Sequence, residues 1–529
     1  MPFNSFQFFL FFPIVGLLYY AVPKKYRWYW LLAVSVVFYL FVGVKCFVFL
    51  FCTTVTSYLA GIGMGNTDGR LRISLERMGT DTALKAQKKE MRENCKRQKK
   101  RIIAAVLCVN FGILAVLKYA GFFCINVNGL LHFLRLPAAI PAFRLFLPLG
   151  ISFYTFQAMG YVIDVYRGKF PPERNLAKFA LFVSFFPQIL EGPIGRYGDL
   201  ANQLYEPHEF DYDNAKYALQ LMLWGYFKKV VIADRAGLLV DMVYGSYRSY
   251  SGLQNAIVAV IYAVQIYADF SGCIDIATGT AQFFGIHLAP NFERPYFSKT
   301  VAEFWRRWHI TLGSWFRDYL FYPVSLSKAG MRLGKFCRKH FGTSFGKNAP
   351  AVLGLSVVWI TTGLWHGADW HYIMYGVYYG VMIIAAMLCR PLFQKMNTAL
   401  HINASGFGFR LFRTLRTFAL VCLGFILFRA ESLGKALDMM RLIFTNYRPA
   451  ISASFFSGNF SKTDLLILIL STGVLFTASL LQRKKSLRGA LAKRPTFVRW
   501  TVYCTAVLCL IFFGVLAVTD PQQFIYFQF

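Results

Sequence analysis

Long apolar segments, separated by shorter polar ones, constrain the fold of this 529-residue chain more than any other feature. A helix needs about 17–25 apolar residues to cross the hydrocarbon core of a bilayer. The composition agrees with a membrane protein, because only 16% of the residues are charged, whereas soluble proteins average about 25%. We predict an all-α polytopic membrane protein with about 11 transmembrane helices. The predicted spans are residues 6–20, 28–42, 46–63, 102–117, 147–165, 256–284, 352–364, 373–388, 415–428, 465–480 and 503–518.

Two further apolar segments are interrupted by proline or by charged side chains. Residues 179–190 contain a proline, and residues 218–240 contain two lysines and an aspartate. Such interruptions at membrane depth are tolerated where the backbone is buried in protein or lines water. We therefore predict re-entrant or interfacial segments at both places. The interrupting residues are Pro187, Lys228, Lys229 and Asp234.

No feature of the sequence divides the chain into domains. It has no internal repeat and no linker rich in Gly and Ser or in Pro. We predict one polytopic domain, residues 1–529, with a motif-bearing core at approximately 145–390. The one long polar stretch, residues 65–101, is rich in helix formers and lacks an apolar stripe. A solvated helix is therefore expected there.

Positive charge is abundant but unevenly placed. Lys and Arg outnumber Asp and Glu by 57 to 25, an excess that in a soluble chain would suggest nucleic acid. Here the positive residues cluster beside predicted spans, at residues 23–27, 88–101 and 483–494. Short loops with an excess of Lys and Arg stay in the cytoplasm. We therefore expect these clusters in the cytoplasm, both chain termini outside it, a lipid bilayer as partner and no nucleic acid.

The eleven cysteines do not form a recognisable framework. They are odd in number, include no C-x-x-C pair and lie mostly within or beside apolar runs. Neither a set of disulfides nor a zinc site is indicated by such a pattern. We expect no metal site.

Charged and aromatic residues are concentrated in NFERPYFSKTVAEFWRRWHITLGSWFRDYLFYP, Asn291 to Pro323. If residues 301–319 are helical, His309 lies on an apolar face with Trp305. One histidine on such a face is more often a structural residue than a catalyst, so both interpretations stay open. The charged residues here are too costly to face lipid and must line water, headgroups or a protein interior. They are Arg306, Arg307, Arg317 and Asp318.

A second group of ionisable residues lies in LWHGADWHY, residues 364–372, between apolar segments. Glycines on either side of Trp365 and His366 allow a break in the helix or a close backbone approach. Histidine exchanges a proton near neutral pH, which is the property that a general base requires. His366 is therefore the candidate base. Asp369 could hold its ring if the intervening turn is helical.

These residues suit general base catalysis in an enclosure of aromatic side chains. A hydroxyl or thiol that attacks a thioester loses its proton as the new bond forms, and a neutral imidazole can accept that proton. Aromatic walls such as Trp365, Trp370 and Tyr375 would exclude water and so limit hydrolysis of the thioester. Arg306 and Arg307 could attract the phosphates of coenzyme A, although a lipid headgroup or an acidic partner explains each of them equally well.

Six segments together form a specific pattern. They are LPLGISFYTFQAMGYVIDVYRG at 147–168, FFPQILEGPIGRY at 185–197, FWRRWHITLGSWFRDYLFYP at 304–323, GLWHGADWHYIMYGVYYG at 363–380, LFRAESLGKA at 427–436 and FIYFQF at 524–529. With them the chain resembles the membrane-bound O-acyltransferase (MBOAT) superfamily, and within it the bacterial alginate O-acetylase-like group. The resemblance runs through most of the chain and is weakest at residues 65–101 and 390–413.

The resemblance implies a shell of helices around a central tunnel, and an enzyme that moves an acyl group onto a hydroxyl. It implies a catalytic histidine at His366 and a second histidine at His309. The implied donor is acetyl-CoA or another acyl-CoA on the cytoplasmic side, with no permanently bound cofactor. The implied acceptor is an exported glycan, reached through a separate extracytoplasmic SGNH-type acyltransferase, and the implied location is the bacterial cytoplasmic (inner) membrane. We place the substrate tunnel at Trp305, Arg306, Arg307, Trp308, Arg317, Asp318, Trp365, Asp369 and Trp370.

Other functions stay open at this point. Similar RWH and WHG motifs occur in the teichoic-acid D-alanylation relatives, and the acceptor of an acyltransferase can also be a lipid or a protein. A transporter or scaffold is the alternative without chemistry, because intramembrane His, Asp and Arg also mark ion pathways. The lack of an inverted repeat or of matched broken helices argues against a transporter.

Overall fold

The structure is a computed structural model that describes residues 1–79, 84–136, 139–141, 145–446, 448, 453–456, 460–483 and 486–515. Within these ranges the chain is helical and contains no β-strand, only an isolated bridge between Phe292 and Trp308. The predicted all-α class is thereby confirmed. The FIYFQF motif at 524–529 lies outside the described residues.

The helices group into two compact units. The first comprises mainly residues 7–215 and 280–289, and the second mainly residues 216–279 and those from Pro290 onward. The chain passes between the units within α8 (Tyr212–Tyr226), within α10 (Gly252–Phe283) and again at residues 289–290. The prediction of a single polytopic domain remains a prediction.

The first unit contains α1 (Phe6–Ala21), η1 (Lys24–Tyr26), α2 (Arg27–Leu40), α3 (Val44–Arg77), α4 (Lys85–Phe133), α5 (Ile151–Tyr166), α6 (Leu176–Ser184) and α7 (Tyr197–Tyr205). The second begins with the π-helical η2 (Phe227–Ala233), α9 (Asp234–Gly245), η3 (Tyr247–Ser249), η4 (Pro295–Phe297), α11 (Val301–Arg307), α12 (Ile310–Phe316) and the π-helical η5 (Arg317–Phe321). It continues with α13 (Tyr322–Ser325), α14 (Lys328–Phe341), α15 (Thr343–His366), α16 (Trp370–Leu388), α17 (Arg390–Ala399), α18 (Phe407–Arg429), α19 (Leu433–Thr445), η6 (Ala453–Phe456), α20 (Lys462–Leu481), α21 (Leu487–Ala492) and α22 (Thr496–Phe513).

Eight of the described helices are long and apolar enough to cross a membrane. They are α3, α4, α10, α15, α16, α18, α20 and α22. The three remaining predicted spans form α1, α2 and α5, which have 16, 14 and 16 residues. These are shorter than the roughly 20 residues of a helix that crosses the hydrocarbon alone. Length and composition together make this a multi-pass membrane protein.

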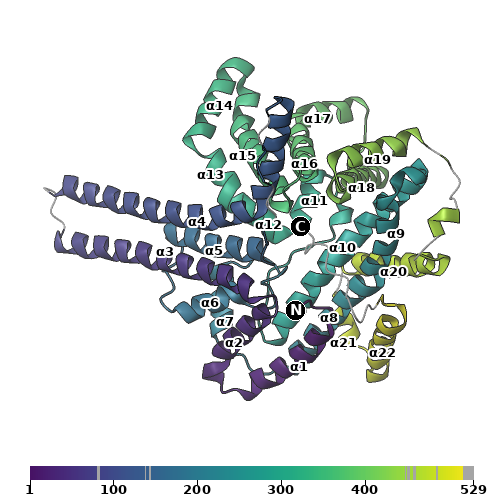
Figure 1. Ribbon diagram of the computed structural model, residues 1–529, viewed down its shortest axis with the longest axis horizontal. Coiled ribbons are helices and arrows are strands. Elements are labelled where there is room, and N and C mark those ends of the chain that lie inside the picture. Colours follow the sequence, from purple (N-terminus) through teal and green to yellow (C-terminus); the bar gives the residue numbers. More distant parts are fainter. Residues whose placement is uncertain are drawn as a thin grey trace. The chain divides into compact units, whose positions relative to one another are not determined.

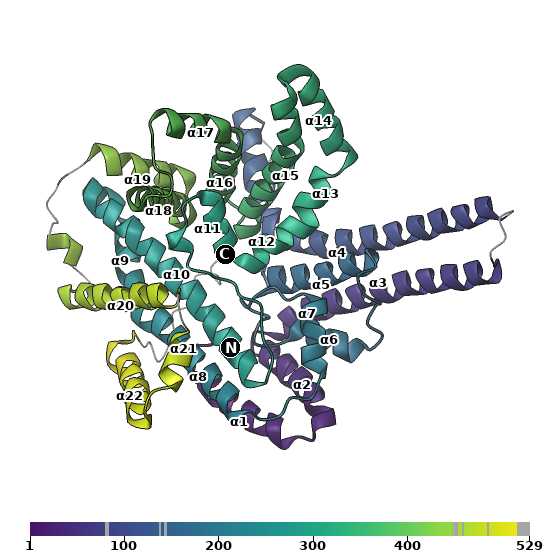
Figure 2. The same cartoon turned by 180° about the vertical axis from the view of Figure 1, so that it is seen from behind.

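The polar stretch at residues 65–101 extends two membrane helices instead of forming a separate loop. Figure 1 shows α3 and α4 side by side as a long hairpin in the first unit, and Figure 2 shows the same pairing from behind. With 34 and 49 residues, these helices are about 50 and 75 Å long at 1.5 Å per residue, well above the thickness of the hydrocarbon. Lys99 on α4 pairs with Asp68 on α3 at 2.7 Å. The expected helical structure is found in two parts, the end of α3 and the start of α4, and residues 80–83 lie outside the described residues.

Buried ion pairs explain the charges that interrupt the apolar stretch at 218–240. Lys229 Nζ lies 2.7 Å from Asp269 Oδ1 and 2.9 Å from Asp234 Oδ1, and all three side chains are at most 4% exposed. Its neighbour Lys228 lies 2.8 Å from Asp275. Both lysines belong to the π-helical turn η2, whose wider turn lets two consecutive side chains reach carboxylates on α10. The stretch is helical throughout, so its predicted re-entrant or interfacial position stays a prediction.

We expect Lys229→Met to destabilise the second unit strongly. The substitution keeps most of the side-chain volume but leaves two carboxylates buried without their cation, and breaking a buried ion pair in this way costs about 3–5 kcal/mol. The thermal unfolding midpoint of the purified protein in detergent measures the effect. The matched control is Lys435→Met, which removes an exposed pair with Glu431 and should leave the midpoint nearly unchanged. Equal midpoints for the two variants would contradict this role of Lys229.

The core of the second unit is rich in aromatic residues and holds the two predicted histidine segments. Helices α15 and α16 pack against each other, and α16 and α11 both pack against α18 (Figures 1 and 2). Buried rings from these helices include Trp359, Tyr379 and Phe425, and Trp308, which directly follows α11, joins them. This packing fixes the ends of α11 and α15, where His309 and His366 lie.

Candidate active site

The helix breaks at His309, so residues 301–319 do not form the single helix on which the expected apolar face of His309 depended. Helix α11 ends at Arg307, Trp308 is extended, and His309 adopts a left-handed conformation with φ 46° before α12 begins. A residue other than glycine in this region is strained by about 1–3 kcal/mol and needs support from its surroundings. A long-range backbone pairing provides that support, and no local pattern could have revealed it.

The pairing comes from the segment that follows α10. The amide of Glu293 donates to the carbonyl of Arg307 at 2.9 Å, and the amide of Ile310 donates to the carbonyl of Asn291 at 3.0 Å. These two bonds flank the bridge between Phe292 and Trp308. The break between α11 and α12 is therefore clamped on both sides, and the side chain of His309 is held at 2% exposure.

Asn291 also determines which nitrogen of His309 carries the proton. Its Oδ1 lies 3.1 Å from the backbone nitrogen of Thr311, which can only donate, so the atom facing it must be the amide oxygen. The same oxygen lies 3.1 Å from His309 Nδ1. Because this oxygen accepts, Nδ1 must donate. In the neutral ring, Nε2 is then the nitrogen that can accept a proton or a hydrogen bond.

Burial keeps this ring neutral. His309 lies outside the eight candidate spans, and burial among aromatic side chains lowers its pKa from 6.5 to about 3. The ring of Phe270 meets it edge to face, with the centroids 4.8 Å apart. At neutral pH His309 therefore presents an uncharged imidazole of fixed orientation.

His366 is the last residue of α15. The next residue, Gly367, is extended, and a β-carbon there would lie 2.2 Å from the ring of Tyr372. The predicted break with a close approach at the glycine is confirmed. The side chain of His366 is 4% exposed, and the rings of Tyr375 and Phe428 stand perpendicular to it at 5.5 and 5.0 Å. The carboxyl end of a helix favours a positive charge, which suits a histidine that takes up a proton.

One indole ring links the two histidines. The ring centroid of Trp365 lies 5.8 Å from that of His309 and 4.8 Å from that of His366. Two histidines that are 57 positions apart in the sequence thus meet at one buried tryptophan. A proton-accepting imidazole beside a second, neutral imidazole in an aromatic enclosure can perform general base chemistry away from bulk water.

Comparison with known proteins shows the family. Residues 173–427, which include both histidines, match the membrane-bound O-acyltransferase family. The chain is 33% identical over 449 residues to a protein of Azotobacter vinelandii named probable alginate O-acetylase, covering 84% of this chain and 78% of that one. The chain belongs to the membrane-bound O-acyltransferase family. It is an acyltransferase.

Two further relatives of this acyltransferase carry names with other acceptors. A peptidoglycan O-acetyltransferase of Helicobacter pylori is 30% identical over 361 residues, which is 63% of each chain. A teichoic acid D-alanyltransferase of Bacillus subtilis is 28% identical over 291 residues, or 54% of this chain and 69% of that one. The names of the three relatives thus refer to three different polymers, alginate, peptidoglycan and teichoic acid.

The sequence analysis allowed Asp369 to orient the ring of His366, but in the acyltransferase Asp369 bonds to another histidine. Its carboxylate lies 2.9 Å from Nδ1 of His371 and also accepts the backbone N–H of that residue at 3.2 Å, capping α16. The α15 helix ends before Asp369, so the geometry of a helical turn, which the prediction required, is absent. Asp369 and His371 form their own pair.

The aromatic tunnel candidates differ in their burial. Trp305 packs on Trp359 and Tyr379 at 5.0 and 4.9 Å, and Trp308 is buried. Trp370, by contrast, is 52% exposed at the start of α16.

Three of the four charged tunnel candidates, Arg307, Arg317 and Asp318, take part in ion pairs. Arg307 pairs with Glu303 at 2.7 Å, and Arg317 pairs with its neighbour Asp318 at 2.8 Å. Arg306 is exposed. None of these pairs touches either histidine in the described contacts, so their predicted contact with substrate stays a prediction.

Sequence reasoning missed three residues that contact the histidines. Asn291 orients His309, Phe270 packs on the same ring, and Phe428 packs on His366. Asn291 stands at the start of the segment singled out for its charged and aromatic residues. Its eighteen-residue separation from His309 hides the contact from any periodicity of helix or strand.

Proposed function

We propose that this acyltransferase moves an acetyl group from acetyl-CoA toward the hydroxyls of an exported polysaccharide, with His366 as general base. The observation that carries the proposal is the meeting of His309 and His366 at Trp365 inside the aromatic core. The names of the relatives, an alginate O-acetylase and a peptidoglycan O-acetyltransferase, support an acetyl group and a glycan acceptor. No permanently bound cofactor is needed for this chemistry.

The proposed reaction balances with one base. As the oxygen of the acceptor attacks the carbonyl carbon of the thioester, His366 takes its proton. The carbon–sulfur bond then breaks, and the departing thiolate receives a proton from the imidazolium, so free coenzyme A and an O-acetyl ester result. His309, neutral and fixed through Nδ1, contributes through Nε2 by positioning the donor or acceptor. Trp365 and Tyr375 exclude water from the thioester.

The product must finally appear outside the cell, where the exported glycan lies. We propose that the protein resides in the cytoplasmic membrane of a bacterium and works with a separate extracytoplasmic SGNH-type acyltransferase. Helices long enough to cross the membrane support a route between the two compartments.

A transfer assay with radioactive acetyl-CoA tests the proposed function. Membranes that contain the protein are incubated with carbon-14 acetyl-CoA together with a periplasmic extract and the host glycan, and label is measured in polysaccharide, lipid and protein. We expect protein-dependent label in polysaccharide as an alkali-labile ester. Label confined to lipid or protein would overturn the glycan acceptor. Transfer of D-alanine but not of acetyl would favour the teichoic-acid type of reaction.

Charge distribution predicts the orientation in the membrane. We expect the basic clusters at 88–101 and 483–494 in the cytoplasm and Gly458, which lies outside the described residues, on the other side. Single cysteines at these places, labelled in intact cells with an impermeant maleimide, measure this. The native exposed cysteines Cys52, Cys108 and Cys504 are first replaced by serine. Labelling of both basic clusters without labelling at position 458 would contradict the orientation.

A further inference from the structure

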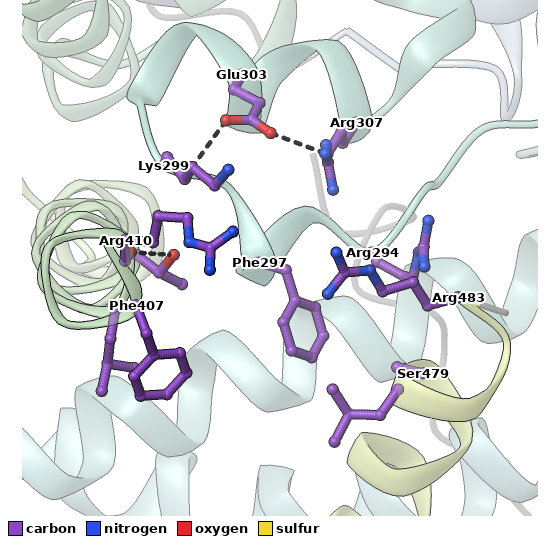
Figure 3. A pocket seen from close by; sticks show the side chains of 12 residues that line it. Arg294, Phe297, Lys299, Glu303, Arg307, Phe407, Arg410, Ser479 and Arg483 are labelled. Atoms are coloured by element: carbon purple, nitrogen blue, oxygen red, sulfur yellow. Dashed lines mark hydrogen bonds and ion pairs between the residues drawn. The ribbon is translucent and has the colours of Figure 1, made fainter. Parts of the chain in front are cut away.

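A strongly basic cavity lies in the second unit, away from the histidine rings described above. It has a volume of about 410 Å³. Helix α11, the start of α18, the end of α20 and the segment around η4 line it (Figure 3). Five cationic side chains and a single carboxylate, that of Glu303, line the cavity. The cations are Arg294, Lys299, Arg307, Arg410 and Arg483.

Most of this positive charge is not neutralised by the protein. Glu303 pairs with Arg307 at 2.7 Å, and Arg294 approaches Glu293 only at 3.5 Å. The ion pairs of the described residues include none for Lys299, Arg410 or Arg483. A recess lined by charges of one sign concentrates the electric field and attracts ions of the opposite sign. The recess therefore selects a ligand with several negative charges.

The surroundings of the cations favour phosphate carried by a nucleotide. Arginine guanidinium groups bind phosphate through two parallel hydrogen bonds. The close-up view shows the ring of Phe297 between the charged ends of Arg410 and Arg294, and Phe407 on the same wall as Arg410 (Figure 3). An aromatic ring beside several cations suits a heterocyclic base attached to phosphates. A lipid headgroup would use the cations but carries no heterocyclic ring to stack on Phe297.

Helix α11 connects this basic pocket to the candidate active site. Glu303 and Arg307 line the pocket, and Arg307 ends the helix two residues before His309. At 1.5 Å per residue, Glu303 and the end of α11 are about 6 Å apart along the axis. Arg483 belongs to the basic cluster at 483–494 that is expected in the cytoplasm, where coenzyme A is found. A ligand held here by its phosphates is thus tied to the element that positions His309.

We infer that the basic pocket binds the phosphorylated adenosine part of the coenzyme A donor and thereby anchors the thioester for transfer. The inference rests on the proposed function, because it assumes an acyl-CoA donor. It assigns donor recognition to Lys299, Arg410 and Arg483. Of the two arginines considered from the sequence, it retains Arg307, which lines the pocket, and not Arg306, which does not.

Binding of a non-reactive donor analogue tests the inference. Desulfo-coenzyme A is titrated calorimetrically into the full chain in nanodiscs of phosphatidylcholine. We expect the double variant Arg410→Gln/Arg483→Gln to bind about 10- to 100-fold more weakly, as for the loss of charge-assisted hydrogen bonds. Arg410→Lys keeps the positive charge but cannot form two parallel hydrogen bonds to phosphate, so its affinity should lie between those of the wild type and the double variant. Arg413→Gln is the matched control, because Arg413 lies on α18 but does not line the pocket.

Two further measurements separate the possible ligands. Dephospho-desulfo-coenzyme A lacks the 3′-phosphate, and we expect it to bind more weakly than desulfo-coenzyme A to the wild type but to lose less affinity in the double variant. Nanodiscs with phosphatidylglycerol test an anionic lipid in the same pocket. If the double variant binds desulfo-coenzyme A as the wild type does, the inference is wrong. If the double variant loses only the stabilisation that phosphatidylglycerol gives to the wild-type protein, the pocket is a lipid site and the inference is also wrong.

Failure of the pocket assignment can be distinguished from failure of the proposed function. If wild-type membranes transfer acetyl from acetyl-CoA and the double variant does so with an unchanged KM, only the pocket is assigned wrongly. If wild-type membranes do not use acetyl-CoA at all, the proposed donor fails. A monodisperse elution profile of each variant shows that the fold is intact, and an increased KM with an unchanged kcat is the result that the inference predicts.

Discussion

Replacing His366 with glutamine is expected to reduce acyl transfer by about 10²- to 10⁴-fold, because a positioned general base contributes this much to the rate. Glutamine fills similar space at the end of α15 but cannot take up a proton at neutral pH. The fold should survive, since the glutamine side chain can keep packing against the rings of Tyr375 and Phe428 that contact His366. The initial rate of acetyl transfer in membranes with equal amounts of protein measures the loss.

His371→Gln is the matched comparison for this variant. His371 lies five residues further along, is also buried, and pairs with Asp369. We expect it to retain much more activity than His366→Gln, because the rings described around His309 and His366 do not include it. Equal losses in the two variants, with both proteins monodisperse, would show that any disturbance of this segment is harmful and would remove the assignment of His366.

Asn291→Leu is expected to impair both stability and catalysis. The amide oxygen of Asn291 accepts three hydrogen bonds, from His309 Nδ1 and from the backbone and hydroxyl of Thr311. A buried donor left without its acceptor costs about 1–3 kcal/mol. A ring displaced by about 1 Å loses about 10²-fold in rate. The unfolding midpoint and the transfer rate should therefore fall together, whereas the control Asn348→Leu on α15 should change neither appreciably.

Asn291→Asp separates positioning of His309 from a purely structural role. A carboxylate keeps the acceptor oxygens but favours the protonated imidazole, so it raises the pKa of His309. If the neutral ring is required, activity is lost at low pH and recovers as the pH rises through that higher pKa. A wild-type pH profile in this variant would show that Asn291 only supports the backbone, because a structural role would not move the profile.

Local sequence patterns predicted those parts of the structure that depend on neighbouring residues. The apolar runs gave the helices, the helix formers at 65–101 extended α3 and α4, and the glycine after His366 ended α15. Each of these follows from propensity, hydrophobicity or the small size of glycine, all of which can be read within one turn or one span.

Long-range contacts could not be predicted in this way. The left-handed backbone of His309 depends on pairing with Asn291 and Glu293, which lie beyond the reach of helical periodicity. The hydrogen-bond partner of Asp369 depended on whether the turn after His366 was helical. In the structure this turn is not helical, and Asp369 pairs with His371 instead. The cations of the basic pocket come from segments as distant in the sequence as Arg294 and Arg483. The composition gives the total number of cationic residues but cannot show that these ones line the same pocket.

The most direct test of the central claim is the O-acetyl content of the exported glycan in living cells. The host gene is deleted and replaced by the wild type, His366→Gln or His371→Gln at equal membrane abundance, and esters on purified polysaccharide are counted by proton NMR. The proposed function predicts normal O-acetyl content with the wild type, most of it with His371→Gln and essentially none with His366→Gln. Wild-type O-acetyl content with His366→Gln would contradict the claim that this histidine is the base of the acyl transfer.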